Sequence, residues 1–196
     1  MKKRLWITSL SLVWLLVQAI PAPAQSPTAY VRGILDGVMG LQNDPALSTQ
    51  ARAKAVHGII AKNFDFALMA KDSLGQTYDG LSSGQRQEFI RTFSYLFQDS
   101  YTRLVLNFLK KENIQYGKES LQGDRAQVAT TIVRTNENIP VTYLMHTASQ
   151  GWILYDVIVD GVSILQNYKT QFGQVIRTKS FDFLLKRMEE QRRAIQ

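Results

Sequence analysis

The chain has 196 residues, no cysteine, two histidines and a formal net charge of +7. Without cysteine, thiol catalysis, thiolate metal sites and iron–sulfur clusters are excluded. Lys and Arg are scattered along the chain, whereas nucleic-acid-binding proteins usually gather them on one face, so we predict no nucleic-acid partner.

The first 24 residues have the pattern of a secretory signal peptide. Three basic residues at 2–4 precede an uncharged, mostly apolar run at 5–20, and the small residues of Ala22-Pro23-Ala24 follow. A retained membrane anchor is the alternative, but the apolar run is shorter than the roughly 20 residues that a spanning helix needs. We therefore predict cleavage after Ala24.

The remainder, 25–196, is long enough for one domain with its own core. Three of the 23 basic residues lie in the signal segment, so the other 20 outnumber the 16 acidic residues by four. No later segment approaches spanning length. We predict a single exported domain, 25–196, that is not an integral membrane protein.

The first half of this domain has helical periodicity. The pattern predicts helices over Tyr30–Met39, from Ser48 or Thr49 to Lys62, from Phe64 to Gly75, and from Ser82 or Ser83 to Lys110. The last of these is the longest, and its apolar residues recur at steps of three and four. They are Phe89, Ile90, Phe93, Leu96, Phe97, Tyr101, Leu104, Val105 and Phe108.

The period then changes to that of strands. We predict strands at Ile114–Leu121, Arg125–Arg134, Ile139–Ala148 and Trp152–Val159, separated by short polar turns. Short turns between neighbouring strands imply an antiparallel meander. Strict alternation would place Ile153, Tyr155, Val157 and Val159 on one face of the last strand and Trp152, Leu154, Asp156 and Ile158 on the other. Because both faces are largely apolar, we expect a sheet that is covered on both sides or that faces a cavity.

Helical spacing returns after Gly161, and a last amphipathic helix begins at about Phe181. Helices, a meander and further helices predict an α+β domain. Asp156 is either a buried acid with a raised pKa or, as we favour, a hydrogen-bond partner of a neighbouring helix or of a Tyr hydroxyl. His146 is expected to be structural and His57 to lie near solvent. No metal-binding spacing or nucleophile motif is present.

Aromatic residues are abundant, with nine Phe and eight Tyr. Many fall on the long helix, on the last two strands and on the helix after Gly161. They predict either a well-packed core or a cavity for an apolar ligand, and spacing does not choose between the two.

The sequence resembles the MlaC family, the periplasmic phospholipid carriers of the Mla pathway, also called the toluene-tolerance Ttg2 family. The resemblance rests mainly on the segment from Trp152 to Ile164 and on Asn167-Tyr168-Lys169-Thr170-Gln171-Phe172. Further matches are Phe64-Asp65-Phe66 with Met69-Ala70 and Leu74-Gly75, and Leu81-Ser82 with Gln85-Arg86 and Phe89. The family usually has Arg where this chain has Lys169, which keeps the charge but loses the planar fork.

The resemblance implies an NTF2-like α+β fold, with an antiparallel four-stranded curved sheet packed with helices around an apolar ligand cavity. It implies a carrier in the periplasm rather than an enzyme, with a phospholipid as cargo and no cofactor. Its expected partners are an outer-membrane lipoprotein complex and an inner-membrane ABC transporter with an MCE-domain subunit, and its expected role is to maintain outer-membrane lipid asymmetry.

Inward-facing apolar positions are the predicted lipid-binding residues. They are Phe93, Phe97 and Tyr101 on the long helix, Val141, Tyr143 and Met145 on the third strand, Tyr155, Val157 and Val159 on the fourth, and Tyr168 and Phe172 on the helix after Gly161.

Three other hypotheses remain open. The cargo could be a hopanoid-type terpenoid, because relatives of the family are found with hopanoid biosynthesis genes. An NTF2-like isomerase or dehydratase would use Asp156 with Tyr155 or Tyr143. A non-lipid adaptor would have a solid core without a cavity.

Overall fold

A computed structural model describes residues 25–195 of the chain, so the predicted signal peptide and its cleavage site lie outside the described residues. The helices are α1 (Pro27–Asn43), α2 (Thr49–Asn63), α3 (Phe66–Leu74), α4 (Gln76–Asp79), α5 (Ser83–Phe108), α6 (Ile164–Thr178) and α7 (Phe181–Ile195). The strands are β1 (Asn113–Gln122), β2 (Arg125–Val133), β3 (Asn138–Ala148), β4 (Gly151–Val159) and β5 (Val162–Ser163). The α+β class and the predicted order of helices and strands are confirmed.

Side-chain caps explain where the helices begin. Ser26, Ser48, Asp65, Ser82 and Ser163 each accept a hydrogen bond from the backbone N–H three residues later. This bond satisfies one of the free donors in the first turn of a helix. At α5 the Gln three residues after Ser82 also reaches back to the Ser82 backbone, which completes a capping box.

The sheet is antiparallel, in the order β1-β2-β3-β4-β5. The four predicted strands are present, and a fifth strand of two residues pairs with the end of β4. The prediction of four strands missed β5 because a two-residue strand has no detectable period. Asp160 and Gly161 form the turn between β4 and β5, and both have positive φ angles.

A β-bulge in β4 overturns the predicted alternation of its faces. Leu144 pairs with Asp156, whereas the next residue, Met145, pairs with Leu154, so Tyr155 is the extra residue. An extra residue reverses the facing of everything beyond it. Leu154 and Val157 therefore share the buried face, and Tyr155 does not share a face with Val157 as predicted.

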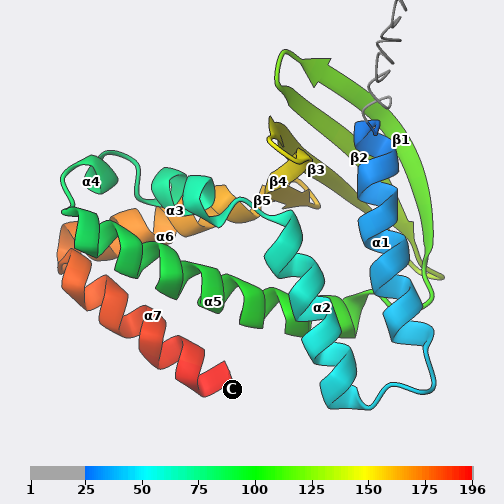
Figure 1. Ribbon diagram of the computed structural model, residues 1–196, viewed down its shortest axis with the longest axis horizontal. Helices are drawn as coiled ribbons and strands as arrows, with labels where there is room; N and C mark the ends of the chain where they lie inside the picture. Colours follow the sequence, from blue (N-terminus) through cyan, green and yellow to red (C-terminus); the bar gives the residue numbers. More distant parts are fainter. Residues whose placement is uncertain (1–24, 196) are drawn as a thin grey trace, which may run out of the picture.

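Two hydrophobic clusters form the interior. In Figure 1, α1 lies along β1 and β2, while the long α5 packs against α2, α3 and α7. The sheet cluster consists of Val31, Leu35, Val38, Leu109, Ala126, Val128, Ile132, Ile139, Val141, Tyr143, Met145, Leu154 and Val157. The helix cluster consists of Val56, Ile60, Met69, Ala70, Leu74, Phe89, Phe93, Leu96, Phe97, Phe172, Leu184 and Met188.

Three half-buried residues, which we call the seam, pack against both clusters. They are Phe64, Val105 and Ile164. Phe64 forms an isolated parallel bridge with Leu154, and the Asp65 N–H donates to the Leu154 carbonyl over 2.8 Å. The segment before α3 is thereby joined to β4 at the boundary between the clusters.

Within residues 25–195, no helix combines the length and the hydropathy that crossing a membrane requires.

Candidate functional site

The aromatic part of the helix cluster centres on Phe93. Its ring centroid lies 6.0 Å from Phe89, 6.1 Å from Phe97, 5.3 Å from Tyr168 and 6.2 Å from Phe172. The contacts with Tyr168 and Phe172 are edge-to-face, the geometry that the ring quadrupoles favour. Phe93 has no exposed surface, so these rings form a closed and specifically packed core.

Two tyrosines continue this core toward the sheet. The ring of Tyr101 lies 4.2 Å from that of Phe97, and Tyr168 contacts Phe93 and Phe172. Burial raises the pKa of Tyr168 to about 12. Burial also raises the pKa of Tyr101, and the nearby Tyr168 hydroxyl and the charge of Asp156 raise it further. Both phenols are neutral at physiological pH even at the ordinary pKa of about 10, so the raised values indicate only that burial disfavours the charged form.

The eleven predicted lipid-binding residues fall into two groups. Phe93, Phe97 and Phe172 belong to the helix cluster, with Tyr101, Tyr155 and Tyr168 packed against it. Val141, Tyr143, Met145 and Val157 belong to the sheet cluster, with Val159 packed against it. The residues thus lie on the two sides of the seam and contact neighbours in their own cluster. Their role as the lining of a lipid cavity stays a prediction.

The seam itself was not among the predicted site residues. Phe64 stands in a segment that carried the family resemblance, and Val105 continues the apolar stripe of α5. Neither signal indicates that a residue touches two clusters, because that property depends on tertiary packing rather than on periodicity.

Asp156 connects β4 to the start of α6. Its carboxylate accepts from the Ser163 hydroxyl over 2.5 Å, from the Leu165 N–H over 3.0 Å and from its neighbour Val157 N–H over 2.8 Å. A carboxylate at a helix N-terminus is also favoured by the helix dipole. The preferred prediction, that Asp156 bonds a neighbouring helix, is confirmed.

Both histidines lie against a carboxylate. His146 Nε2 lies 3.0 Å from Asp65 Oδ2, and the other oxygen of this carboxylate caps α3. This contact joins β3 to α3, as expected of a structural histidine. His57 Nε2 lies 3.5 Å from Asp99 Oδ1, with about a third of its side chain exposed. The described residues contain no group of three or more His, Asp or Glu side chains that could hold a metal ion.

The sequence did not predict a polar cleft at the C-terminal end of α5. The cleft has a volume of about 1840 Å³ and is lined by α2, the end of α1, the last turns of α5, and the loops at 110–113 and 133–137. These segments are distant in the sequence, so only the fold brings their polar residues together.

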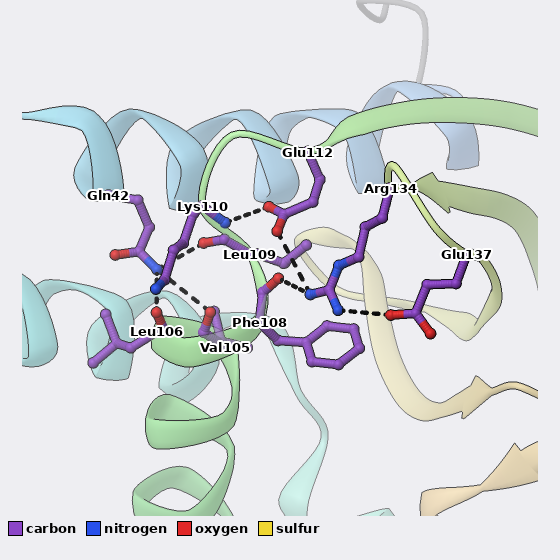
Figure 2. Close-up of polar contacts among 9 residues, drawn as sticks. All are labelled: Gln42, Val105, Leu106, Phe108, Leu109, Lys110, Glu112, Arg134 and Glu137. Carbon is purple, nitrogen blue, oxygen red and sulfur yellow. Dashed lines mark hydrogen bonds and ion pairs between the residues drawn. The ribbon is translucent and has the colours of Figure 1, made fainter.

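Side-chain donors close the C-terminal end of α5 beside this cleft (Figure 2). Gln42 Nε2 donates to the carbonyls of Leu106 and Leu109 over 2.9 and 2.7 Å. Arg134 donates to the carbonyl of Phe108 over 2.6 Å and lies over the Phe108 ring. The last carbonyls of a helix lack partners within the helix, and here Gln42 of α1 and Arg134, the residue after β2, supply them.

The geometry defines a small α+β protein in which a curved antiparallel sheet and a helical layer enclose two apolar clusters. The chain belongs to the MlaC family, because the family model described as "MlaC protein" matches residues 34–190. The predicted resemblance is therefore confirmed.

Two relatives illustrate the similarity. The intermembrane phospholipid transport system binding protein MlaC of Haemophilus influenzae is 25% identical over 123 residues, which are 60% of this chain and 57% of that protein. The match thus spans little more than half of the relative. The solved structure of a phospholipid-binding protein from Ralstonia solanacearum in complex with a phospholipid superposes with a TM-score of 0.74. It is 23% identical, with 89% of this chain and 99% of that chain covered, and shows that the fold is shared.

Proposed function

We propose that this protein is a periplasmic phospholipid carrier that holds acyl chains between the sheet cluster and the helix cluster. The observation that carries the proposal is the seam, where half-buried apolar residues join two buried clusters. Apolar surfaces that meet through a few residues can separate beside the Asp65–Leu154 backbone hydrogen bond and accept a chain. The phospholipid complex of the structural relative supports this use of the fold.

The energetics explain why a carrier needs no catalytic group. Two acyl chains contain about 30 methylenes, and burial of each is worth roughly 0.8 kcal/mol. A lipid therefore does not cross water unaided, and an apolar site is sufficient to carry it. Both oxygens of Asp156 are engaged by donors from β4, β5 and α6, which supports a structural role for the acid that an isomerase or dehydratase would use.

Membership of the family supports the wider role. We propose that residues 25–196, once the signal segment is removed, form the single lipid-binding domain. The protein would pass phospholipid between an outer-membrane lipoprotein complex and an inner-membrane ABC transporter with an MCE-domain subunit. This transfer would maintain the lipid asymmetry of the outer membrane.

Native mass spectrometry of the protein purified from the periplasm tests the proposal. We expect a bound mass that is released on denaturation and identified as one phospholipid per chain. A hopanoid in place of the phospholipid would change the proposed cargo but would still support a carrier function. A folded protein that contains no lipid and takes up none from vesicles would contradict the proposal.

A further inference from the structure

The positive charge of the domain is concentrated in its last two helices. Residues 164–195 contain seven basic and three acidic residues, whereas residues 25–163 contain thirteen of each. The excess of four positive charges in the described residues therefore belongs to α6 and α7, which follow one another directly and pack together (Figure 1). A surface with such an excess attracts a partner of negative charge.

Most of these cations have no partner within residues 25–195. The charged groups that form no hydrogen bond or ion pair there are those of Lys169, Arg177, Lys179, Lys186, Arg187 and Arg193. The seventh cation is Arg192, whose guanidinium lies 4.9 Å from the centroid of the Tyr95 ring. The three carboxylates of the same two helices form no ion pair with these cations. The excess charge is therefore available to a partner outside the domain.

A groove with a volume of about 390 Å³ lies between α6 and α7. Buried or half-buried apolar side chains form its floor, and exposed side chains form its rim. The floor residues are Phe172, Val175, Leu184 and Met188, and the rim residues are Gln171, Gln174, Thr178, Lys179, Phe183, Arg187 and Gln191. Two of the unpartnered cations, Lys179 and Arg187, are thus in the rim. Among the described residues that line the groove, none is Asp or Glu.

The rim residues form one row on each helix. Phe183, Arg187 and Gln191 are four residues apart on α7, so they lie along one face of the helix. Gln171 and Thr178 are two turns apart on α6 and line the other side. The rise of an α-helix gives the row on α7 a length of about 12 Å and places Phe183 about 6 Å from Arg187. The groove therefore has the length of about two helical turns, with an apolar group and a cation one turn apart.

We propose that this groove is the docking site of an acidic amphipathic helix of a partner protein. The partner helix inserts an apolar side chain beside Phe183, over the apolar floor, and places carboxylates against Arg187 and Lys179. Side chains one turn apart lie on the same face of a helix, so one face of the partner supplies both kinds of contact. Carboxylates form charge-assisted hydrogen bonds with guanidinium and ammonium groups, and the glutamines of the rim offer donors and acceptors to other polar groups.

The shape of the surface favours a helix over an anionic lipid bilayer. A bilayer contacts the rim of a concave groove but leaves its floor unfilled, and Phe183, 45% exposed, is the large apolar side chain of this rim. A side chain that protrudes from a helix fills the floor. Of the predicted acyl-chain residues, only Phe172 lines the groove, and it is buried in the floor. The proposal therefore does not rest on lipid carriage.

The first experiment selects binders for the folded protein from a displayed library of amphipathic helical peptides. We expect the selected peptides to carry Asp or Glu one turn from an apolar residue. Fluorescence anisotropy then measures the Kd of the tightest peptide, which Lys179→Gln/Arg187→Gln should raise about tenfold. The matched control, Lys169→Gln/Arg193→Gln, removes the same charges from the same two helices outside the groove. An empty selection, peptides without acidic residues, or equal weakening by both pairs of substitutions would overturn the site.

A second pair of variants tests the groove without a change of charge. Gln174→Trp places a large ring in the groove and should weaken the peptide severalfold. Gln166→Trp is the control, because Gln166 is exposed on α6 outside the groove, and it should leave the Kd unchanged. Equal Kd values for the two variants would contradict docking in the groove.

Other occupants of the groove are tested with the same variants. Flotation with phosphatidylglycerol vesicles reports on a membrane, and sedimentation velocity reports on a second copy of the chain. If Lys179→Gln/Arg187→Gln abolished vesicle binding or self-association but left peptide binding intact, the proposed partner helix would be wrong. Circular dichroism checks that each variant is folded, and lipid content by mass spectrometry reports separately on the carrier function.

Discussion

The two apolar clusters differ in how they are covered. Helices α2, α3, α5, α6 and α7 all contribute buried residues to the helix cluster. The sheet cluster takes its buried residues from β2, β3 and β4 and from Leu109, which follows α5, and among the described helices only α1 contributes buried residues to it. Since a surface that fewer elements cover opens at a lower cost in free energy, we infer that the protein opens against the sheet while the helix cluster preserves the fold.

The clusters also differ in side-chain chemistry. The helix cluster buries four phenylalanines, and their rings make edge-to-face and tilted contacts with one another and with Tyr101 and Tyr168. The buried members of the sheet cluster are mostly aliphatic, and Tyr143 is the aromatic residue among them. Aliphatic surfaces make contacts that an acyl chain can replace, whereas the ring contacts depend on specific geometry. The predictions below test this division of roles.

The largest effect is expected from Phe93→Ala. Phe93 is fully buried and contacts four aromatic rings, so truncation should lower the free energy of unfolding by about 3–5 kcal/mol. Urea denaturation followed by circular dichroism measures the change. Phe183→Ala is the control, because 45% of Phe183 is exposed and its removal should cost about 0.5 kcal/mol or less. Similar losses in both variants would contradict a closed helix cluster.

The sequence predicted most of this helical layer because its signals are local. Ser48, Asp65 and Ser82 mark the starts of helices, and the three- and four-residue spacing of α5 marks its buried face. The strands were predicted to within about two residues because polar turns separate them. The two-residue β5 and the four-residue α4 are too short to show a period.

The candidate site was predicted less well, for two physical reasons. The alternation of β4 fails at Tyr155, because a bulge adds one residue without changing the local composition. The seam and the polar cleft depend on contacts between residues far apart in the chain, such as Gln42 with Leu109 and His57 with Asp99. The predicted aromatic and aliphatic residues pack into the interior, but the sequence did not divide them between two clusters.

Asp156→Asn should have the next largest effect, because Asp156 joins the sheet to the helical layer. An amide has one acceptor oxygen, so at least one of the donors Ser163 O–H and Leu165 N–H loses its partner. We expect a loss of roughly 2–3 kcal/mol in the free energy of unfolding, measured by urea denaturation. Ser163→Ala removes its bond to the carboxylate and also the side-chain cap of α6, so it should cost about 1–2 kcal/mol. Lost lipid content at unchanged stability would instead indicate a direct role of the acid in ligand binding.

Val157→Trp tests where the acyl chains lie. Val157 faces the sheet cluster, so a larger ring should fill the space into which a chain enters, at a cost of about 1–3 kcal/mol in stability. We expect bound lipid, measured by native mass spectrometry, to fall severalfold in a protein that remains folded. The control Ile158→Trp places the same ring on the opposite face of β4. If both variants kept their lipid, the acyl chains would lie elsewhere.

The last prediction, which has no effect on stability at neutral pH, concerns the response of the clusters to alkaline pH. Burial raises the pKa of Tyr168 to about 12, from about 10 in the unfolded chain. The neutral phenol therefore contributes its full stability below pH 10. Between pH 10 and 12 the unfolded chain releases the proton first, so the free energy of unfolding falls by about 1.4 kcal/mol per pH unit from this group.

Tyr168→Phe removes the titrating phenol. The free energy of unfolding of the variant should therefore fall less steeply between pH 10 and 12 than that of the wild type. Urea denaturation at each pH measures the free energy of unfolding of both proteins. The titration of lysines affects the two proteins alike, so it cancels in the difference between them. Tyr143→Phe makes the same comparison in the sheet cluster, where burial also raises the pKa of the phenol. If the sheet cluster opens in solution, water reaches Tyr143 and its substitution flattens the profile less than Tyr168→Phe does. Equal flattening would mean that both clusters exclude water equally, and the proposed division between an opening sheet cluster and a closed helix cluster would fail.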